Sequence, residues 1–226
     1  MAASSHPATV TCNGREYRFP DQPTVVVCID GSEPGYIEAA IEAGLAPNCQ
    51  RIMASGANLL AKSVVPSFTN PNNMSIITGR PPAVHGIAGN YFYDPETREE
   101  VMMNDARFLR APTIMHAFHE AGARVAVVTA KDKLRALLTK DIDFASGRAV
   151  GFSSEKSDQV SKADNGIDDA LGLVGMPVPD VYSGELSEFV FAAGVKLLET
   201  FKPDVMYLST TDYIQHKAAP GSEIAN

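Results

Sequence analysis

The chain has 226 residues, of which 45% are hydrophobic, and it carries a formal net charge of −8. This length suits one large domain with an ample core, and the negative charge gives no electrostatic support for a nucleic-acid partner. An acidic protein that handles an anion must build a local positive site from metal, lysine or helix ends. We see neither a signal peptide nor a membrane span, and the three cysteines (Cys12, Cys28 and Cys49) lack metal-type spacing. We therefore expect reduced thiols in a cytoplasmic protein.

The first part of the chain predicts a hairpin and then the start of an α/β core. Residues 9–19 alternate around Asn13-Gly14, which indicates a hairpin. Residues 24–29 form a β-branched run that ends at Asp30 and is typical of a strand covered on both faces. We expect a peripheral hairpin at residues 1–22 and a core over 23–226. Two short helices (36–43 and 47–54) and a second strand (58–65) should follow.

Thr69 lies where the next polar loop should meet the start of a helix. A hydroxyl there faces unpaired backbone N–H groups and the positive end of a helix dipole, which together form an anion site. Threonine is also common as an N-cap or turn residue, so this stretch alone leaves both interpretations open.

Strand and helix patterns then repeat to the end of the chain, which predicts a mostly parallel sheet with helices on both faces. His116 and His119 should flank the polar face of one helix, and residues 141–183 should form a strand or two within a long surface excursion. Residues 219–226 predict a turn and the first turn of a helix, where the sequence stops, so we expect a fragment. The expected elements are a hairpin at 90–103, helices at 113–121, 131–138 and 184–201, and strands at 124–129 and 204–209.

Polar residues follow the predicted strands, at the edge where ligands bind in parallel sheets. Asp30, Thr69, Lys131 and Asp212 each occupy such a position. Asp212 and His216 are four residues apart, so one helical turn would place both on one face, where they could share a divalent metal. Each signal is weak alone, since Asp-Gly turns and surface Asp/His pairs are ordinary. Together they offer ligands for two cations around a hydroxyl, an arrangement that can ionise the hydroxyl and hold a phosphoryl group.

Four blocks in this order, residues 24–31, 66–79, 85–90 and 210–216, resemble the alkaline phosphatase superfamily. Within it they resemble the nucleotide pyrophosphatase/phosphodiesterase-like branch. The run Val128-Thr129-Ala130-Lys131-Asp132-Lys133-Leu134-Arg135 is similar to that of members acting on carboxylated phosphonates. The resemblance implies an alkaline-phosphatase-like core, incomplete at its C-terminus. It also implies that Thr69 is the nucleophile and that Thr69 and Asp30 bind one zinc ion. Asp212 and His216 would bind a second zinc ion. Asn90 would hydrogen-bond a phosphoryl oxygen, and Lys131 and Lys133 would contact the substrate.

The implied reaction is hydrolysis of the C–P bond of phosphonoacetate to acetate and phosphate. Breaking the C–P bond expels a carbanion, which is stable enough to leave only if its negative charge spreads into the neighbouring carboxylate. Lys131 and Lys133 would stabilise this charge as it develops on the carboxylate. The expected partner is therefore a small phosphonate, with neither nucleic acid nor membrane, and a homodimer stays open.

The resemblance also leaves the metal site incomplete. The superfamily's remaining ligands, an Asp-His pair and a further His, lie downstream of the last block, so each zinc keeps two of its expected protein ligands. Zinc normally takes three or four. Two alternatives therefore remain: a phosphodiesterase or nucleotide pyrophosphatase of the same branch, and a non-catalytic, truncated α/β domain.

Overall fold

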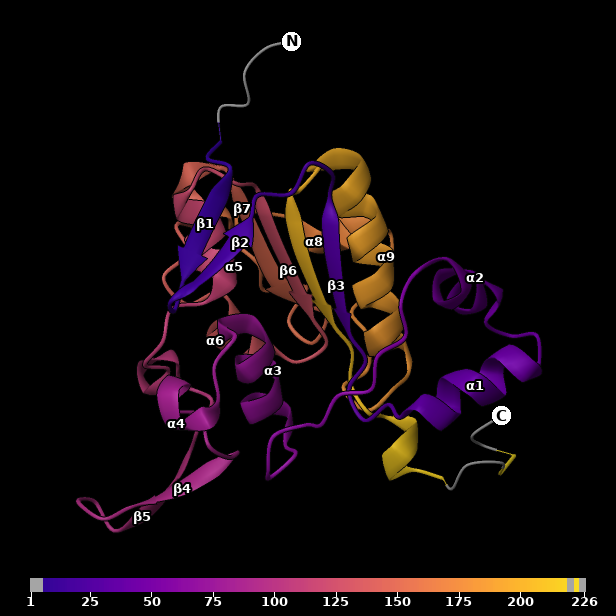
Figure 1. Ribbon diagram of the computed structural model, residues 1–226, viewed down its shortest axis with the longest axis horizontal. Coiled ribbons are helices and arrows are strands. Elements are labelled where there is room, and N and C mark those ends of the chain that lie inside the picture. The colour runs from indigo at the N-terminus through magenta and orange to yellow at the C-terminus, as the bar shows by residue number, and fades with distance from the viewer. Residues whose placement is uncertain (1–5, 219–221, 224–226) are drawn as a thin grey trace.

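The computed structural model describes residues 6–218 and 222–223 (Figure 1). At its centre is a parallel four-stranded sheet with the order β3-β8-β6-β7. The in-register pairs bring the carboxyl ends of the strands to one edge, where Cys28 and Thr129 both pair with Ser209. The predicted parallel sheet is thus confirmed. Its strands are β3 (Thr24–Cys28), β6 (Val125–Thr129), β7 (Ala149–Ser153) and β8 (Val205–Ser209).

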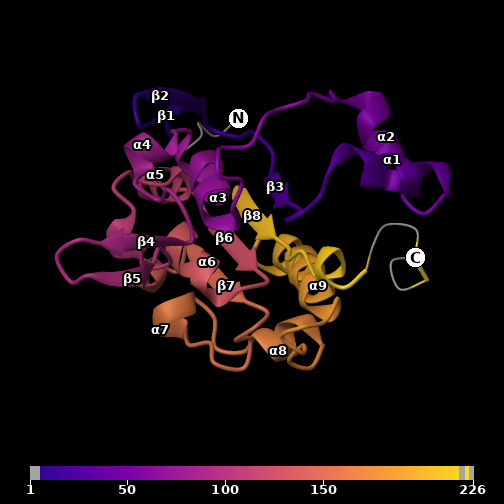
Figure 2. The same cartoon turned by 90° about the horizontal axis from the view of Figure 1, so that it is seen from below.

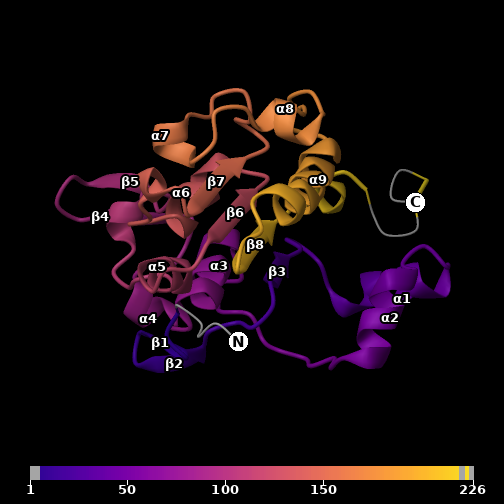
Figure 3. The same ribbon diagram turned by 90° about the horizontal axis from the view of Figure 1, so that it is seen from above.

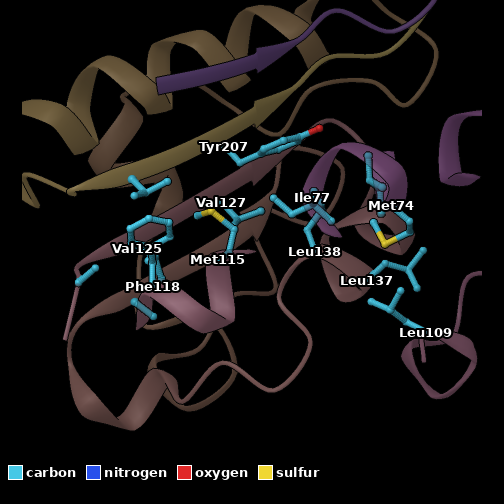
Figure 4. Packing of buried hydrophobic residues seen from close by; sticks show 14 of the residues in the cluster. Met74, Ile77, Leu109, Met115, Phe118, Val125, Val127, Leu137, Leu138 and Tyr207 are labelled. Atoms are coloured by element: carbon cyan, nitrogen blue, oxygen red, sulfur yellow. The ribbon is translucent and has the colours of Figure 1, made fainter. Parts of the chain in front are cut away.

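Helices cover both faces of this sheet, because successive side chains of a strand point to opposite sides. Val125 and Val127 face a core cluster built with α3 (Thr69–Thr78), α5 (Ile114–Glu120) and α6 (Asp132–Leu138), as Figure 4 shows. Ala126 and Val128 face the second cluster, built with α8 (Ala170–Val174) and α9 (Glu185–Thr200). Helix α9 lies so close to β8 that a Cβ at Gly194 would come within 2.7 Å of Leu208 Cδ1.

Two antiparallel hairpins flank this core. In the first, the left-handed φ angles of Asn13 (51°) and Gly14 (69°) form the expected turn. Its Val10 side chain is buried in the first core cluster, so the hairpin packs against the core. The hairpin strands are β1 (Thr9–Cys12) with β2 (Arg15–Arg18), and β4 (Tyr91–Asp94) with β5 (Glu99–Met102).

The remaining elements connect these parts. Helices α1 and α2 lie away from the sheet in the two rotated views (Figures 2 and 3). Within the described residues, no helix has the length and apolar character needed to cross a membrane. The other helices are α1 (Pro34–Glu42), α2 (Pro47–Ser55), α4 (Pro82–His85), α7 (Lys162–Asn165) and the 3₁₀ turns Ala106–Phe108, Phe144–Ser146 and Ile214–His216.

Three expectations from the sequence are wrong. Residues 58–65 form no strand, and Leu59 and Val65 are 84% and 94% exposed. Strand β3 lies at the edge of the sheet with Val27 exposed, so the described residues do not cover both of its faces. His119 is buried rather than on a polar helix face. The predicted helix start at the C-terminus falls largely on residues 219–221 and 224–226, outside the described residues.

Candidate active site

Two acidic side chains meet where β3 and β8 end. Asp30 follows β3, and its backbone N–H donates across 3.2 Å to Oγ1 of Thr210, which lies two residues before Asp212 in the chain. Gly31 has a left-handed φ of +68°, and a Cβ there would lie 2.7 Å from Asp212 Cβ. A residue without a side chain is therefore required for the two strand ends to come this close.

Thr69 is the first residue of α3, and its hydroxyl is directed at the carboxylate of Asp30. Thr69 Oγ1 donates to Asp30 Oδ2 across 2.9 Å. Phe68 occupies the N-cap position and no side chain caps the helix, so the interpretation of Thr69 as an N-cap is wrong. Its hydroxyl thus bonds a carboxylate rather than the backbone of its own helix.

A buried network fixes the turn that carries Thr69. The Tyr207 hydroxyl donates to Asn73 Oδ1 (2.8 Å), and Asn73 Nδ2 donates to the Thr69 carbonyl (3.0 Å). Tyr207 and Asn73 are both buried, and Tyr207 belongs to the central strand β8. The first turn of α3 is therefore tied to the sheet, a link that sequence patterns could not indicate.

The charge balance at this edge favours a cation. Burial raises the pKa of Asp30, the Thr69 hydroxyl lowers it, and the nearby charge of Asp212 raises it again. Asp212 Oδ2 lies 2.8 Å from His216 Nε2 across the 3₁₀ turn Ile214–His216, so the four-residue spacing does bring these side chains together. Two carboxylates in one half-buried place repel one another unless a positive charge lies between them.

One pocket of about 150 Å³ gathers most of the predicted residues. His216 is not among the residues that line it, and its side chain is 74% exposed. Asn90 is held at the rim, since its carbonyl accepts from the Met103 N–H (2.7 Å). The lining consists of the predicted Asp30, Thr69, Asn90, Lys131, Lys133 and Asp212, together with Asn70, Leu134, Thr210 and Thr211, which the sequence analysis missed.

The two pocket lysines flank a tightly bonded turn after β6. The Asp132 backbone N–H donates to Glu155 Oε2 (2.8 Å), and the Asp132 carboxylate accepts from Arg135 Nε (2.8 Å). Burial raises the pKa of Asp132, but the bond and charge of Arg135 outweigh burial and leave the pKa lowered. Positive charge at the start of a helix is unfavourable, and these two acids offset Lys131 and Lys133 there.

The donors at this edge suit zinc in type but supply few ligands per ion. Two carboxylates, a hydroxyl and an imidazole are oxygen and nitrogen ligands of the kind zinc accepts. However, the described residues contain no group of three or more His, Cys, Asp or Glu side chains able to hold a metal ion. Asp30 with Thr69, and Asp212 with His216, form two hydrogen-bonded pairs, and each pair gives an ion two ligands.

A model of the family "Type I phosphodiesterase / nucleotide pyrophosphatase" matches residues 24–225. The chain belongs to this family. A crystal structure of phosphonoacetate hydrolase from Sinorhizobium meliloti 1021, in complex with phosphonoacetate, is 66% identical with a TM-score of 0.93. The match covers 96% of this chain and 52% of that chain, and a second structure of the same protein holds phosphonoformate. These matches confirm the alkaline-phosphatase-like α/β fold and the resemblance to phosphonoacetate hydrolase.

More distant members of the family share the fold. Murine ectonucleotide pyrophosphatase/phosphodiesterase 5 has a TM-score of 0.56 at 18% identity, covering 91% of this chain and 48% of that one. Ectonucleotide pyrophosphatase/phosphodiesterase 1 of Saccharomyces cerevisiae is 35% identical over 92 residues, which are 39% of this chain and 12% of the yeast protein. The chain thus spans about half the length of the solved relatives and less of the curated one.

Proposed function

We propose that this protein hydrolyses the C–P bond of phosphonoacetate to acetate and phosphate, with Thr69 as the nucleophile. The observation that carries the proposal is the shared pocket, in which the Thr69 hydroxyl bonded to Asp30 faces the same space as Lys131 and Lys133. The 66% identity to phosphonoacetate hydrolase supports this choice of substrate.

Two zinc ions are the proposed cofactors. Asp30 and Thr69 would hold one ion, Asp212 and His216 the other, and ligands beyond these four are needed because zinc takes three or four. When bound, the ions supply positive charge that lowers the pKa of the Thr69 hydroxyl and neutralises the phosphoryl oxygens.

The chain's own residues then account for the bond changes. The Thr69 hydroxyl releases its proton to solvent, and its oxygen attacks phosphorus while Asn90 donates to a phosphoryl oxygen. The P–C bond breaks, and its electron pair moves to the methylene carbon and into the carboxylate as an enediolate. Lys131 and Lys133 stabilise that charge where it develops, and a proton from solvent completes acetate. Water cleaves phospho-Thr69, which releases phosphate and restores the hydroxyl.

Phosphate release from phosphonoacetate, with and without added zinc, tests this mechanism. Thr69→Ala should lower the rate by about 10³-fold or more, because loss of a nucleophile removes the covalent route. Thr69→Ser keeps a hydroxyl on the same turn and serves as the matched control. Undiminished phosphate release by Thr69→Ala would show that the nucleophile is wrongly assigned.

The family name supports a second candidate, a phosphodiesterase or nucleotide pyrophosphatase. Turnover of bis(4-nitrophenyl) phosphate far above that of phosphonoacetate would favour it. Lys131→Met separates the two, because it removes the charge and keeps the length. For a phosphonate hydrolase this substitution should lower kcat/KM on phosphonoacetate by about 10²-fold and leave kcat/KM on the diester nearly unchanged.

The third alternative is a non-catalytic domain. Metal analysis of the purified protein tests it, since two bound zinc ions per chain would exclude it.

A further inference from the structure

Lys131 is held from outside the pocket by a segment to which the sequence assigned no role. Its ammonium donates to the Val181 carbonyl across 3.0 Å, 50 residues away in the chain. The same nitrogen lies 5.4 Å from the centroid of the Tyr182 ring. Tyr182 is 76% exposed, so hydrophobic burial does not account for its position over the lysine.

We propose that Val181 and Tyr182 position the Lys131 ammonium for the carboxylate of the substrate, so that Tyr182 helps to determine specificity for carboxylated phosphonates. This inference rests on the proposed function. It assigns Tyr182 a positioning role, because the ring acts through Lys131 and not on the reacting atoms.

The geometry leaves Lys131 free to bind an anion after both contacts are made. An ammonium has three N–H donors, of which the Val181 carbonyl takes one. The Tyr182 ring attracts the charge through its face without using a strong acceptor. The remaining donors can reach the pocket that Lys131 lines together with Thr69. A long, flexible lysine side chain is thereby ordered before the substrate arrives, which lowers the entropy cost of binding.

Tyr182 also lines a second cavity, which shares its two lysines with the pocket. A wider cavity of about 740 Å³, lined by Val181 and Tyr182, shares Lys131 and Lys133 with the smaller pocket that contains Thr69. A substrate entering through this cavity would meet the two lysines first. A carboxylate on the substrate would be bound at that end, while the phosphoryl group reaches Thr69.

Val181 and Tyr182 lead into the start of α9, and two hydrogen bonds hold that helix start in place. Ser154 Oγ donates to the Leu186 carbonyl (2.9 Å), which fixes the helix start to the end of β7. Ser187 Oγ accepts from the Thr211 N–H (3.3 Å), directly before Asp212. The start of the helix that follows Tyr182 in the chain is thus bonded both to the end of β7 and to the segment that carries Asp212.

Kinetics on two substrates test the role in specificity. Tyr182→Leu should raise KM for phosphonoacetate by about two- to fivefold, and Tyr182→Phe should match the wild type because it keeps the ring face. Turnover of bis(4-nitrophenyl) phosphate, which has no carboxylate, should be unchanged in both variants. Tyr93→Leu, at an exposed tyrosine on β4, controls for loss of a surface ring. An unchanged KM in Tyr182→Leu, or equal changes with both substrates, would overturn the inference.

Chemical labelling tests the positioning without relying on activity. Acetic anhydride at a limiting dose, followed by peptide mass spectrometry, reports the accessibility of each lysine amine. Relative to Lys196 on α9, Lys131 should be labelled about two- to fivefold faster in Tyr182→Leu and at the wild-type rate in Tyr182→Phe. An unchanged Lys131 rate in Tyr182→Leu would overturn the positioning even in an active enzyme. If the labelling behaves as expected but the wild type releases no phosphate from phosphonoacetate, the proposed function fails, and the specificity role with it.

Discussion

At the scale of single residues, Tyr207 links the sheet to Thr69. Its hydroxyl bonds Asn73, which in turn bonds the Thr69 carbonyl, and both Tyr207 and Asn73 are buried. Burial is the main cause that raises the pKa of Tyr207, so the phenol stays protonated and remains a donor. The proposed nucleophile, Thr69, is held in place only as firmly as the first turn of α3, and the central strand β8 fixes that turn.

Tyr207→Phe should therefore destabilise the protein although it removes a single oxygen atom. The Asn73 side-chain oxygen would be left buried without a donor, which costs about 1–3 kcal/mol in the free energy of unfolding. Urea denaturation measures this change. Tyr93→Phe removes a hydroxyl from an exposed ring and should stay within about 0.5 kcal/mol of the wild type. Equal stabilities of the two variants would contradict a structural role for the Tyr207–Asn73 bond.

His85 makes the stability depend on pH at a site away from the pocket. The Ile87 N–H donates to His85 Nδ1 (3.2 Å), and Nε2 lies 2.9 Å from Ser75 Oγ, so the neutral ring carries its proton on Nε2. Burial first, and then the charge of Arg110, lowers the pKa of His85 to about 4. Protonation of Nδ1 would break the bond to Ile87.

The sign of the effect follows from the lowered pKa. An unfolded histidine has a pKa of about 6.5, so the unfolded state binds the proton first and the stabilisation is complete above that pH. The free energy of unfolding should fall between pH 6.5 and 4, by at most about 3 kcal/mol from His85. His85→Gln should flatten this dependence in denaturation curves, though not abolish it, because the pKa of buried His119 is lowered too. An unchanged slope in His85→Gln would show that other groups cause the acid sensitivity.

At the scale of elements, the turn after β3 decides how closely the carboxylates approach. Gly31→Ala should destabilise the protein by more than about 1 kcal/mol, because the methyl group adds a contact of 2.7 Å with Asp212 Cβ to the cost of a left-handed φ. Gly44→Ala is the matched control, since Gly44 has a φ of +74° and open space around its Cβ. Phosphate release should fall in Gly31→Ala alone. Equal effects of both substitutions on stability and rate would show that the approach to Asp212 is unimportant.

Elements with a local cause could be predicted from the sequence. The Asn13-Gly14 turn fixes its hairpin, and the β-branched run at β6 follows from the packing of a strand between two layers. The meeting of Asp30 and Asp212 followed from one rule, that the carboxyl ends of parallel strands share an edge. Thr69 reaches this edge on the first turn of α3 and not at the end of a strand. The prediction of a strand at residues 58–65 was wrong because an apolar run becomes a strand only beside a partner strand, and the described residues provide none.

Contacts across long sequence separations could not be predicted. The bond from Lys131 to Val181 and the bond from Tyr207 to Asn73 each join residues that no spacing or periodicity relates. His119 was misjudged for a similar reason, because its helix is covered by parts of the chain far away in sequence. The grouping of the pocket side chains could therefore be predicted from the sequence, while the residues that hold these side chains in place required the fold.

At the scale of the whole molecule, one face of the edge strand β3 exposes an apolar surface. Val26 and Cys28 pack against the first core cluster, so Val25 and Val27 point to the opposite face, where they are 40% and 43% exposed. An uncovered apolar face on an edge strand is characteristic of an interaction surface. The surface consists of Val25 and Val27 of β3 together with Ile29, which follows directly after the strand.

This surface should bind an apolar dye in the folded protein. Fluorescence of 8-anilinonaphthalene-1-sulfonate should rise on addition of native protein, and the double substitution Val25→Thr/Val27→Thr should reduce it, because threonine keeps the β-branched shape and replaces a methyl group by a hydroxyl. Val84→Thr makes the same change at a side chain of α4 that is 48% exposed, and it should leave the signal unchanged. Circular dichroism confirms that each variant is folded before the dye is added. Equal fluorescence of the β3 and α4 variants would place the dye elsewhere and show that the face of β3 does not act as an apolar surface.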